Sequence, residues 1–245
     1  MDIVSALDLE SHSHTAVSHI WLENIAAHRY LDMESALCGF ARDYCAYTSG
    51  FPGYLSRLIQ KLDRADHRAL LERNLREERG HLDPGDRDQL WAVAIDPDDV
   101  EGIPHSELYR RFCRALGLDE AELDLPDSVG RQWRERMFAF LDTASPAAAL
   151  GALGPGTEGV VRPIYRKLSA GLRALENLTP RDRVFFDLHC AVDDQHAQDL
   201  QQVARDLLDT PQARDDMRQG MLEALRLRQI FFSHQHLRAS AEFPL

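Results

Sequence analysis

A histidine, an aspartate and a second histidine recur at helical spacing in the last third of the chain. They are His189, Asp193 and His196, in a stretch without glycine or proline. Because positions i, i+4 and i+7 share one face of an α-helix, the three side chains are predicted to point the same way. Two imidazoles and a carboxylate form a ligand set for a divalent transition metal. A polar, solvated helix face is the alternative. Cys190 lies about 100° away on an ideal helix and is not counted as a ligand.

Three ligands on one helix do not complete a metal site. Helical bundles build metal centres from Glu and His side chains that point inward from several helices. Two more segments offer candidates: residues 73–78, followed after a break by 105–112, and residues 156–165, which contain Glu158. Glu158 stands among glycines and valines, which is an unusual place for a charge that only solvates the surface.

Other polar residues near these candidates have two interpretations each. Arg162 is one turn after Glu158 on the same helix face. It could bind a substrate carboxylate with its planar fork, or it could pair with a neighbouring acid. Asp194 is either an acceptor for the N–H of a ligand histidine or a surface carboxylate. Pro163 is predicted to kink its helix near the metals.

The segments that carry these residues are predicted to be helices. Apolar residues recur at steps of three and four, and alternation of valine and isoleucine is absent, so no sheet is predicted. Two Thr-Pro pairs, Thr179-Pro180 and Thr210-Pro211, combine a helix cap with a proline in the first turn. The pattern predicts one all-α domain over residues 1–245, with helices at about 15–30, 34–49, 54–62, 67–79, 105–117, 128–141, 157–177, 179–209 and from 211 onward.

Two segments depart from this pattern. Residues 1–14 are polar and contain His12 and His14, and they are predicted to be a disordered lead-in. Residues 80–104 contain three clusters of turn-forming Asp, Pro and Gly, with room for a short helix at about 89–95. We expect this second segment to be an inserted excursion.

The composition excludes several classes of protein. The 245 residues have a formal net charge of −12, so a basic surface for nucleic acid is not expected. No apolar run approaches the roughly 18 residues of a membrane span. The first residues lack the basic start of a signal peptide. The four cysteines have no zinc-type spacing and are expected to be reduced thiols. A cytoplasmic protein without nucleic-acid or membrane partners is therefore predicted.

Four local patterns, taken together, resemble the haem-oxygenase-like di-iron oxidases and oxygenases. These proteins share the fold of haem oxygenase, the TenA thiaminases and the PqqC oxidase. The resemblance covers about residues 20 to 230 and implies a bundle of about seven to nine helices. The patterns are Asn74-Leu75-x-x-Glu78, His105-x-x-Leu108-Tyr109-x-x-Phe112 with Ala115-Leu116-Gly117, Glu158-Gly159, and His189-x-x-x-Asp193-x-x-His196.

The resemblance implies a set of metal ligands: Glu78, His105, Glu158, His189, Asp193 and His196. Two Fe(II) ions would bind there and use O2 as co-substrate. Oxygen and imidazole donors fit iron or manganese better than Cu(I). The chain departs from its relatives in the spacing of the first glutamate ligand and its histidine. In the relatives these two residues lie on one helix, whereas here about 25 residues separate Glu78 from His105. His81 is therefore an alternative ligand. His105 is favoured because the apolar pattern that follows it resembles the family.

The expected function is that of an O2-dependent non-haem di-iron oxidase or oxygenase in specialised metabolism. Its substrate is expected to be a small carboxylate, such as an amino acid or a derivative, which undergoes C–C cleavage, desaturation or N-oxygenation. Relatives also imply a homodimer and an external reductant. A fatty-acid decarboxylase of the same fold is one alternative, and a metal-free TenA- or PqqC-like enzyme or binding module is another. Several aromatic residues are candidates for the substrate cavity, with plain core packing as the alternative: Tyr44, Tyr47, Phe51, Tyr165 and Phe186.

Overall fold

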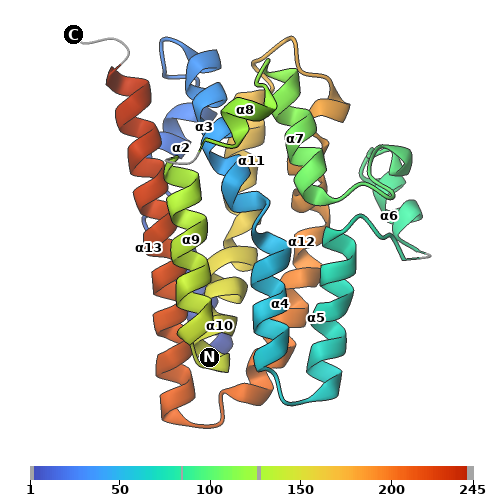
Figure 1. The fold of residues 1–245 in the computed structure, drawn as a ribbon, viewed down its shortest axis with the longest axis vertical. Coiled ribbons are helices and arrows are strands. Elements are labelled where there is room, and N and C mark those ends of the chain that lie inside the picture. The colour runs from blue at the N-terminus through green and yellow to red at the C-terminus, as the bar shows by residue number, and fades with distance from the viewer. Residues whose placement is uncertain (1–2, 84, 126–127, 242–245) are drawn as a thin grey trace.

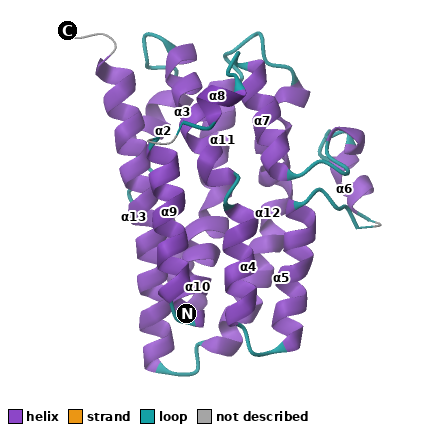
Figure 2. Ribbon diagram, in the orientation of Figure 1, coloured by secondary structure: helices purple, strands orange, loops and turns teal. Residues whose placement is uncertain are grey.

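The computed structural model describes residues 3–83, 85–125 and 128–241, apart from the side chains of residues 192–195. Within these ranges every regular element is a helix, which confirms the all-α prediction (Figure 2). The elements outnumber the seven to nine helices predicted, because short helices also form inside segments that read as connections. They are α1 (Ile3–His12), α2 (Ile20–Ala26), α3 (Met33–Thr48), α4 (Phe51–Lys61), α5 (Ala65–Glu78), α6 (Asp86–Ala92), η1 (Pro97–Asp99), α7 (His105–Ala115), α8 (Glu120–Leu123), α9 (Val129–Thr143), α10 (Pro146–Leu153), η2 (Gly154–Glu158), α11 (Gly159–Leu172), α12 (Pro180–Leu207) and α13 (Pro211–Ala241).

The long helices stand side by side along the long axis of the molecule (Figure 1). α12 and α13 are the longest, with 28 and 31 residues, and a short turn joins them at one end of the bundle. The start of α12 is fixed by a capping box, in which the Thr179 hydroxyl and the Asp182 carboxylate each bind the other's backbone N–H. None of the described helices has both the length and the apolar character that a membrane crossing requires.

The first helix corrects the prediction of a disordered lead-in at residues 1–14. Residues 3–12 form α1, and its Val4 and Leu7 side chains are buried against the core. These residues are three apart, so they share one helix face. The apolar stripe is too short to stand out from the polar residues around it, which is why the helix was not predicted. At the end of α1, the His12 ring donates its Nε2–H to the Gly159 carbonyl over 2.7 Å. That carbonyl would face the N–H of residue 163 in a regular helix, but Pro163 has none to donate.

Residues 79–104 leave the bundle sideways between α5 and α7 (Figure 1). The base of this excursion is closed by the backbone, since the Gly102 N–H donates to the Gly80 carbonyl over 2.7 Å. Gly80 has a φ of +87°, and a Cβ there would lie 2.5 Å from the backbone of Ile103. Only glycine fits this position. The excursion therefore returns the chain to the point at which it left.

Glycines bring α13 into direct contact with α10 and η2. A Cβ at Gly220 would lie 1.8 Å from the Ala148 carbonyl oxygen, and one at Gly151 would lie 1.9 Å from that of Met217. Gly156 meets Ala224 of α13 in the same way, at 2.9 Å from its Cβ. Residues 147–153 of α10 are all buried. This contact fixes the position of α13 against the turn that ends at Glu158.

We predict that Gly220→Ala destabilises the protein by at least about 2 kcal/mol, because the methyl group forces the two helices apart. An Ala in place of Gly within a helix is otherwise stabilising, so the sign of the effect is diagnostic. Urea unfolding followed by circular dichroism measures the change. Gly85→Ala is the control, since its Cβ would meet no atom within 4 Å. Equal stability of both variants would contradict the close contact.

Candidate metal centre

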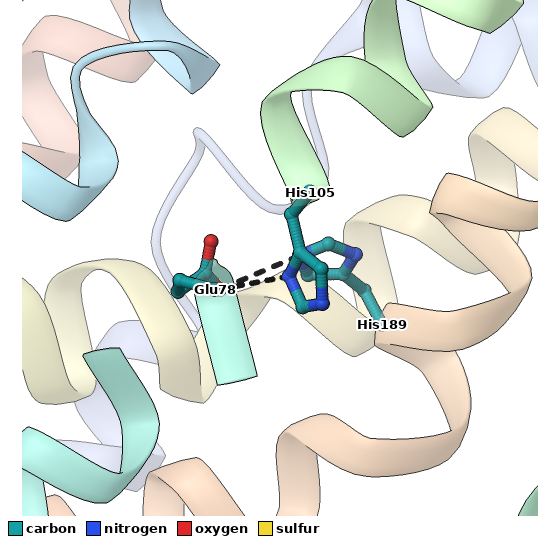
Figure 3. Close-up of side chains that lie close together, drawn as sticks. All are labelled: Glu78, His105 and His189. Carbon is teal, nitrogen blue, oxygen red and sulfur yellow. Dashed lines mark hydrogen bonds and ion pairs between the residues drawn. The ribbon is translucent and has the colours of Figure 1, made fainter. Parts of the chain in front are cut away.

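Glu78, His105 and His189 meet in the interior of the bundle, from α5, α7 and α12 (Figure 3). All three are buried, and their potential ligand atoms lie within 4.8 Å of one another. His105 Nδ1 is 3.0 Å from Glu78 Oε1, and His189 Nε2 is 4.0 Å from the same oxygen. Residues far apart in the sequence thus form one compact group of donors.

A second group of buried donors shares Glu78 with the first. It consists of Glu78, Glu158 and His196, again with ligand atoms within 4.8 Å of one another. Five of the six predicted ligand residues therefore lie in two adjoining groups. The sixth, Asp193, lies between His189 and His196 on α12, but its side chain is outside the described part of the structure, as is that of Asp194.

The structure brings His105, and not His81, to Glu78. The side chain of His81 is 60% exposed, and its Nε2 lies 3.5 Å from a carboxylate oxygen of Asp83. Glu78 is the last residue of α5, and His105 is the first residue of α7. The closed base of the excursion holds these two helix ends together, so distance along the sequence does not separate the side chains.

Glu158 is positioned by a turn of π-helix, η2, whose five residues are all buried. The turn continues directly into α11, and its Thr157 hydroxyl donates to the Ala152 carbonyl over 2.8 Å. Wide turns of this kind are often found at functional sites. The glycines that looked unusual beside Glu158 allow η2 to press against α13, and this contact directs the carboxylate into the bundle.

Hydrogen bonds orient the two α12 imidazoles for coordination. His189 Nδ1–H donates to the Phe185 carbonyl over 2.7 Å, and because a carbonyl only accepts, Nε2 carries the lone pair. His196 Nε2–H donates to Glu77 Oε2 over 2.6 Å, which leaves Nδ1 for a metal. Carboxylates that hold the second nitrogen of a ligand histidine in this way are a regular feature of metal sites.

Burial and mutual attraction shift the pKa values of this cluster in opposite directions. Burial alone would raise the pKa of Glu78, but His105 and the other histidines lower it to about 2. Burial raises the pKa of Glu158 to about 7, with the charge of Glu78 adding to the effect. Burial and the neighbouring His105 lower the pKa of His189 to about 3.

His196 behaves differently from His189. Burial would lower its pKa, yet the hydrogen bond to Glu77 and the charge of Glu158 raise it to about 9. Without a metal, protons on His196 and on Glu158 therefore offset part of the buried negative charge. A bound cation would replace those protons, which is the usual exchange when metal ligands deprotonate.

The donor set fits divalent iron. Glu78, His105 and His189 would hold one ion, and Glu78, Glu158 and His196 would hold a second. Glu78 belongs to both groups. Imidazole and carboxylate without thiolate suit Fe(II). The described residues thus offer two adjoining sites that share one carboxylate.

A small cavity of about 30 Å³ borders the first group of donors. Four of the five aromatic residues predicted to line it do so, namely Tyr44, Tyr47, Phe51 and Tyr165. Phe186 is buried in the core, and its neighbour Phe185 takes that place in the wall. Glu78, Glu158, His105 and His189 also face the cavity, whereas Arg162 is not among its lining residues. Substrate bound there would contact the metal ligands directly.

Comparison with known proteins agrees with this geometry. A model of the family of iron-containing redox enzymes matches residues 38–229. The chain belongs to this family. The 4-aminobenzoate synthase of Chlamydia pneumoniae is similar to it, with 27% identity over 192 residues, which make up 77% of this chain and 75% of the relative.

Solved structures show that this iron-containing redox enzyme family member has the haem-oxygenase-like, TenA-like fold. A TenA homologue from Pseudomonas syringae superposes with a TM-score of 0.72 at 14% identity, covering 96% of this chain and 91% of the homologue. A CADD-like protein of unknown function from Nostoc punctiforme gives 0.71 at 17% identity, covering 99% and 97%. At such identities the likeness concerns the fold alone.

We predict that Glu77→Gln weakens iron binding by about 10- to 100-fold, because the neutral amide holds His196 less firmly in its orientation. Titration of anaerobic, metal-free protein with Fe(II) measures the affinity. Glu72→Gln is the matched control, since Glu72 lies on the same helix and is exposed. If Glu77→Gln binds iron as tightly as the wild type, Glu77 does not support a ligand.

Proposed function

We propose that the chain is a non-haem di-iron oxidoreductase that uses O2 to oxidise a small organic carboxylate. The observation that carries this proposal is the position of Glu78, shared by two buried groups of metal donors. Membership of the iron-containing redox enzymes supports it. Two ferrous ions, when bound, supply the electrons that reduce O2. An external reductant would then be needed to restore the ferrous state.

The residues of the chain would bind and orient both partners of this reaction. His189 and His196 are held by the Phe185 carbonyl and by Glu77, so their free nitrogens are fixed before any metal binds. Aromatic side chains along the cavity exclude water from the substrate. A dry, preorganised site of this kind favours oxidation of the substrate over loss of reactive species to solvent.

The cavity favours a small substrate over a long acyl chain. Its free volume is only about 30 Å³, room for about one or two water molecules, so even a small substrate needs the side chains of the wall to move, and a long acyl chain needs far more space. Tyrosines contribute much of its wall. An amino acid or an aromatic acid fits such surroundings better than a fatty acid does. The relative named 4-aminobenzoate synthase also concerns a small aromatic carboxylate, and C–C cleavage, desaturation and N-oxygenation remain the reactions we consider.

We predict that the wild-type protein binds about two Fe(II) per chain and that His189→Ala and Glu158→Ala each lose at least half of this iron. O2 consumption by the iron-loaded protein should fall at least about 100-fold in both variants, since each removes a donor from one of the two groups. Anaerobic reconstitution followed by metal analysis measures the stoichiometry. Stopped-flow absorption after mixing with O2 measures the reaction.

His234→Ala is the control, because His234 is exposed on α13. It should bind iron and consume O2 as the wild type does. Circular dichroism should show the same helix content in all variants. Full iron content in both His189→Ala and Glu158→Ala would mean that the ions bind elsewhere. A wild-type protein that binds no iron would contradict the proposal and favour a metal-free enzyme or binding module of the same fold.

A further inference from the structure

The first helix, α1, contacts the backbone directly beside the candidate ligand Glu158. Its His12 Nε2–H donates to the carbonyl of Gly159, the next residue along the chain, over 2.7 Å. Asp8 lies one turn before His12 on the same face of α1. Its Oδ1 is 3.9 Å from the point where a Cβ of Gly159 would stand. Two polar side chains of α1 therefore meet at one residue, Gly159.

The Gly159 carbonyl depends on a donor from outside its own helix. In a regular α-helix the N–H of residue 163 would donate to it, but Pro163 has no N–H. The His12 ring supplies the donor in its place. Gly159 is the first residue of α11 and directly follows the π-helical turn η2. The bond from His12 therefore fixes the backbone at the junction of η2 and α11.

The same face of α1 connects this junction to α12. Asp8 Oδ2 accepts a hydrogen bond from Gln201 Nε2 over 2.6 Å, and Gln201 lies five residues after His196 on α12. Glu158 and His196 belong to one group of buried donors, although they come from different segments of the chain. Asp8 and His12 therefore bridge the two segments that must stay together for these donors to share an ion.

We propose that His12 and Asp8 are positioning residues that hold Glu158 and His196 together for the second iron. This inference rests on the proposed function and adds the first helix to it. Both side chains lie outside the two groups of donors, so they act through the backbone of Gly159 and through α12. Loss of a group that orients a metal ligand typically weakens metal binding by about 10- to 100-fold. The contacts of α1 are one step further from the ion, so the lower end of this range is expected.

The test is the titration of anaerobic, metal-free protein with Fe(II), in which each of the two binding affinities is measured. The variants are His12→Ala, His12→Gln and the double variant Asp8→Ala/His12→Ala. Glutamine keeps a donor, because its amide nitrogen is as many bonds from Cα as the Nε2 of histidine. Glu10→Ala is the matched control. Glu10 lies on the same helix but pairs with Arg218 of α13, so its loss leaves the contacts with Gly159 in place.

The double variant should bind one of the two ions about tenfold more weakly and the other as tightly as the wild type. His12→Ala should fall between the wild type and the double variant. His12→Gln and Glu10→Ala should bind both ions as the wild type does. Circular dichroism should show the same helix content in all of them.

A second titration separates positioning from a general loosening of the bundle. In Glu158→Ala the second group of donors is already broken, so one ion remains, held by Glu78, His105 and His189. Adding Asp8→Ala/His12→Ala to this variant should leave the affinity for the remaining ion unchanged. The effects of the two changes are then not additive, as expected when one acts through the other.

Four results would overturn the proposal. The double variant could bind both ions as tightly as the wild type, or Glu10→Ala could weaken iron binding as much as the double variant does. His12→Gln could behave as His12→Ala does, or the double variant could weaken the ion that remains in Glu158→Ala. Failure of the di-iron proposal is distinct from all four, because it would appear as missing iron in the wild type itself.

Discussion

The dominant constraint on this protein is the cost of removing charged groups from water. Two carboxylates, three imidazoles and a guanidinium are buried in the middle of an apolar helical bundle. Such groups are tolerated only when neighbours of opposite charge, hydrogen bonds or bound ions replace the lost water. The pKa values show how each carboxylate is accommodated. Neighbouring histidines lower the pKa of Glu78 and keep it ionised, whereas burial raises the pKa of Glu158 to about 7 and favours its protonated form. A bound cation would take the place of the protons on Glu158 and His196.

The helical scaffold satisfies this constraint by fixing each donor from a different direction. α5 and α7 end and begin at the site, η2 turns into it, and α12 passes alongside it. Two of the donors are also held by a group outside the cluster, His189 by the Phe185 carbonyl and His196 by the Glu77 carboxylate. Donors that are fixed in advance lose little further freedom when a metal binds, and this supports tight and specific coordination.

The sequence predicted those parts of the site that depend on local periodicity. His189 and His196 were predictable because their spacing places them on one helix face whatever surrounds that helix. Pairing of Glu78 with His105 needed the family resemblance, since only the tertiary fold brings residues on either side of an excursion together. Glu77 gave no signal, because nothing local tells a glutamate that binds a histidine from one on the surface. The first helix, α1, was missed because its apolar stripe is only two residues long in the described part, and its packing decides its structure.

The excursion between Glu78 and His105 has a consequence for how the chain can change over evolutionary time. The backbone bond between Gly102 and Gly80 and the contact between the two side chains close the loop at its base. A metal held by both would act as a reversible cross-link across residues 79–104, comparable to a staple. Because the entropy of closing a loop grows only slowly with its length, this segment can be lengthened, shortened or replaced while the ligands stay in place. The excursion is therefore a part of this chain that can acquire new contacts without moving Glu78 or His105.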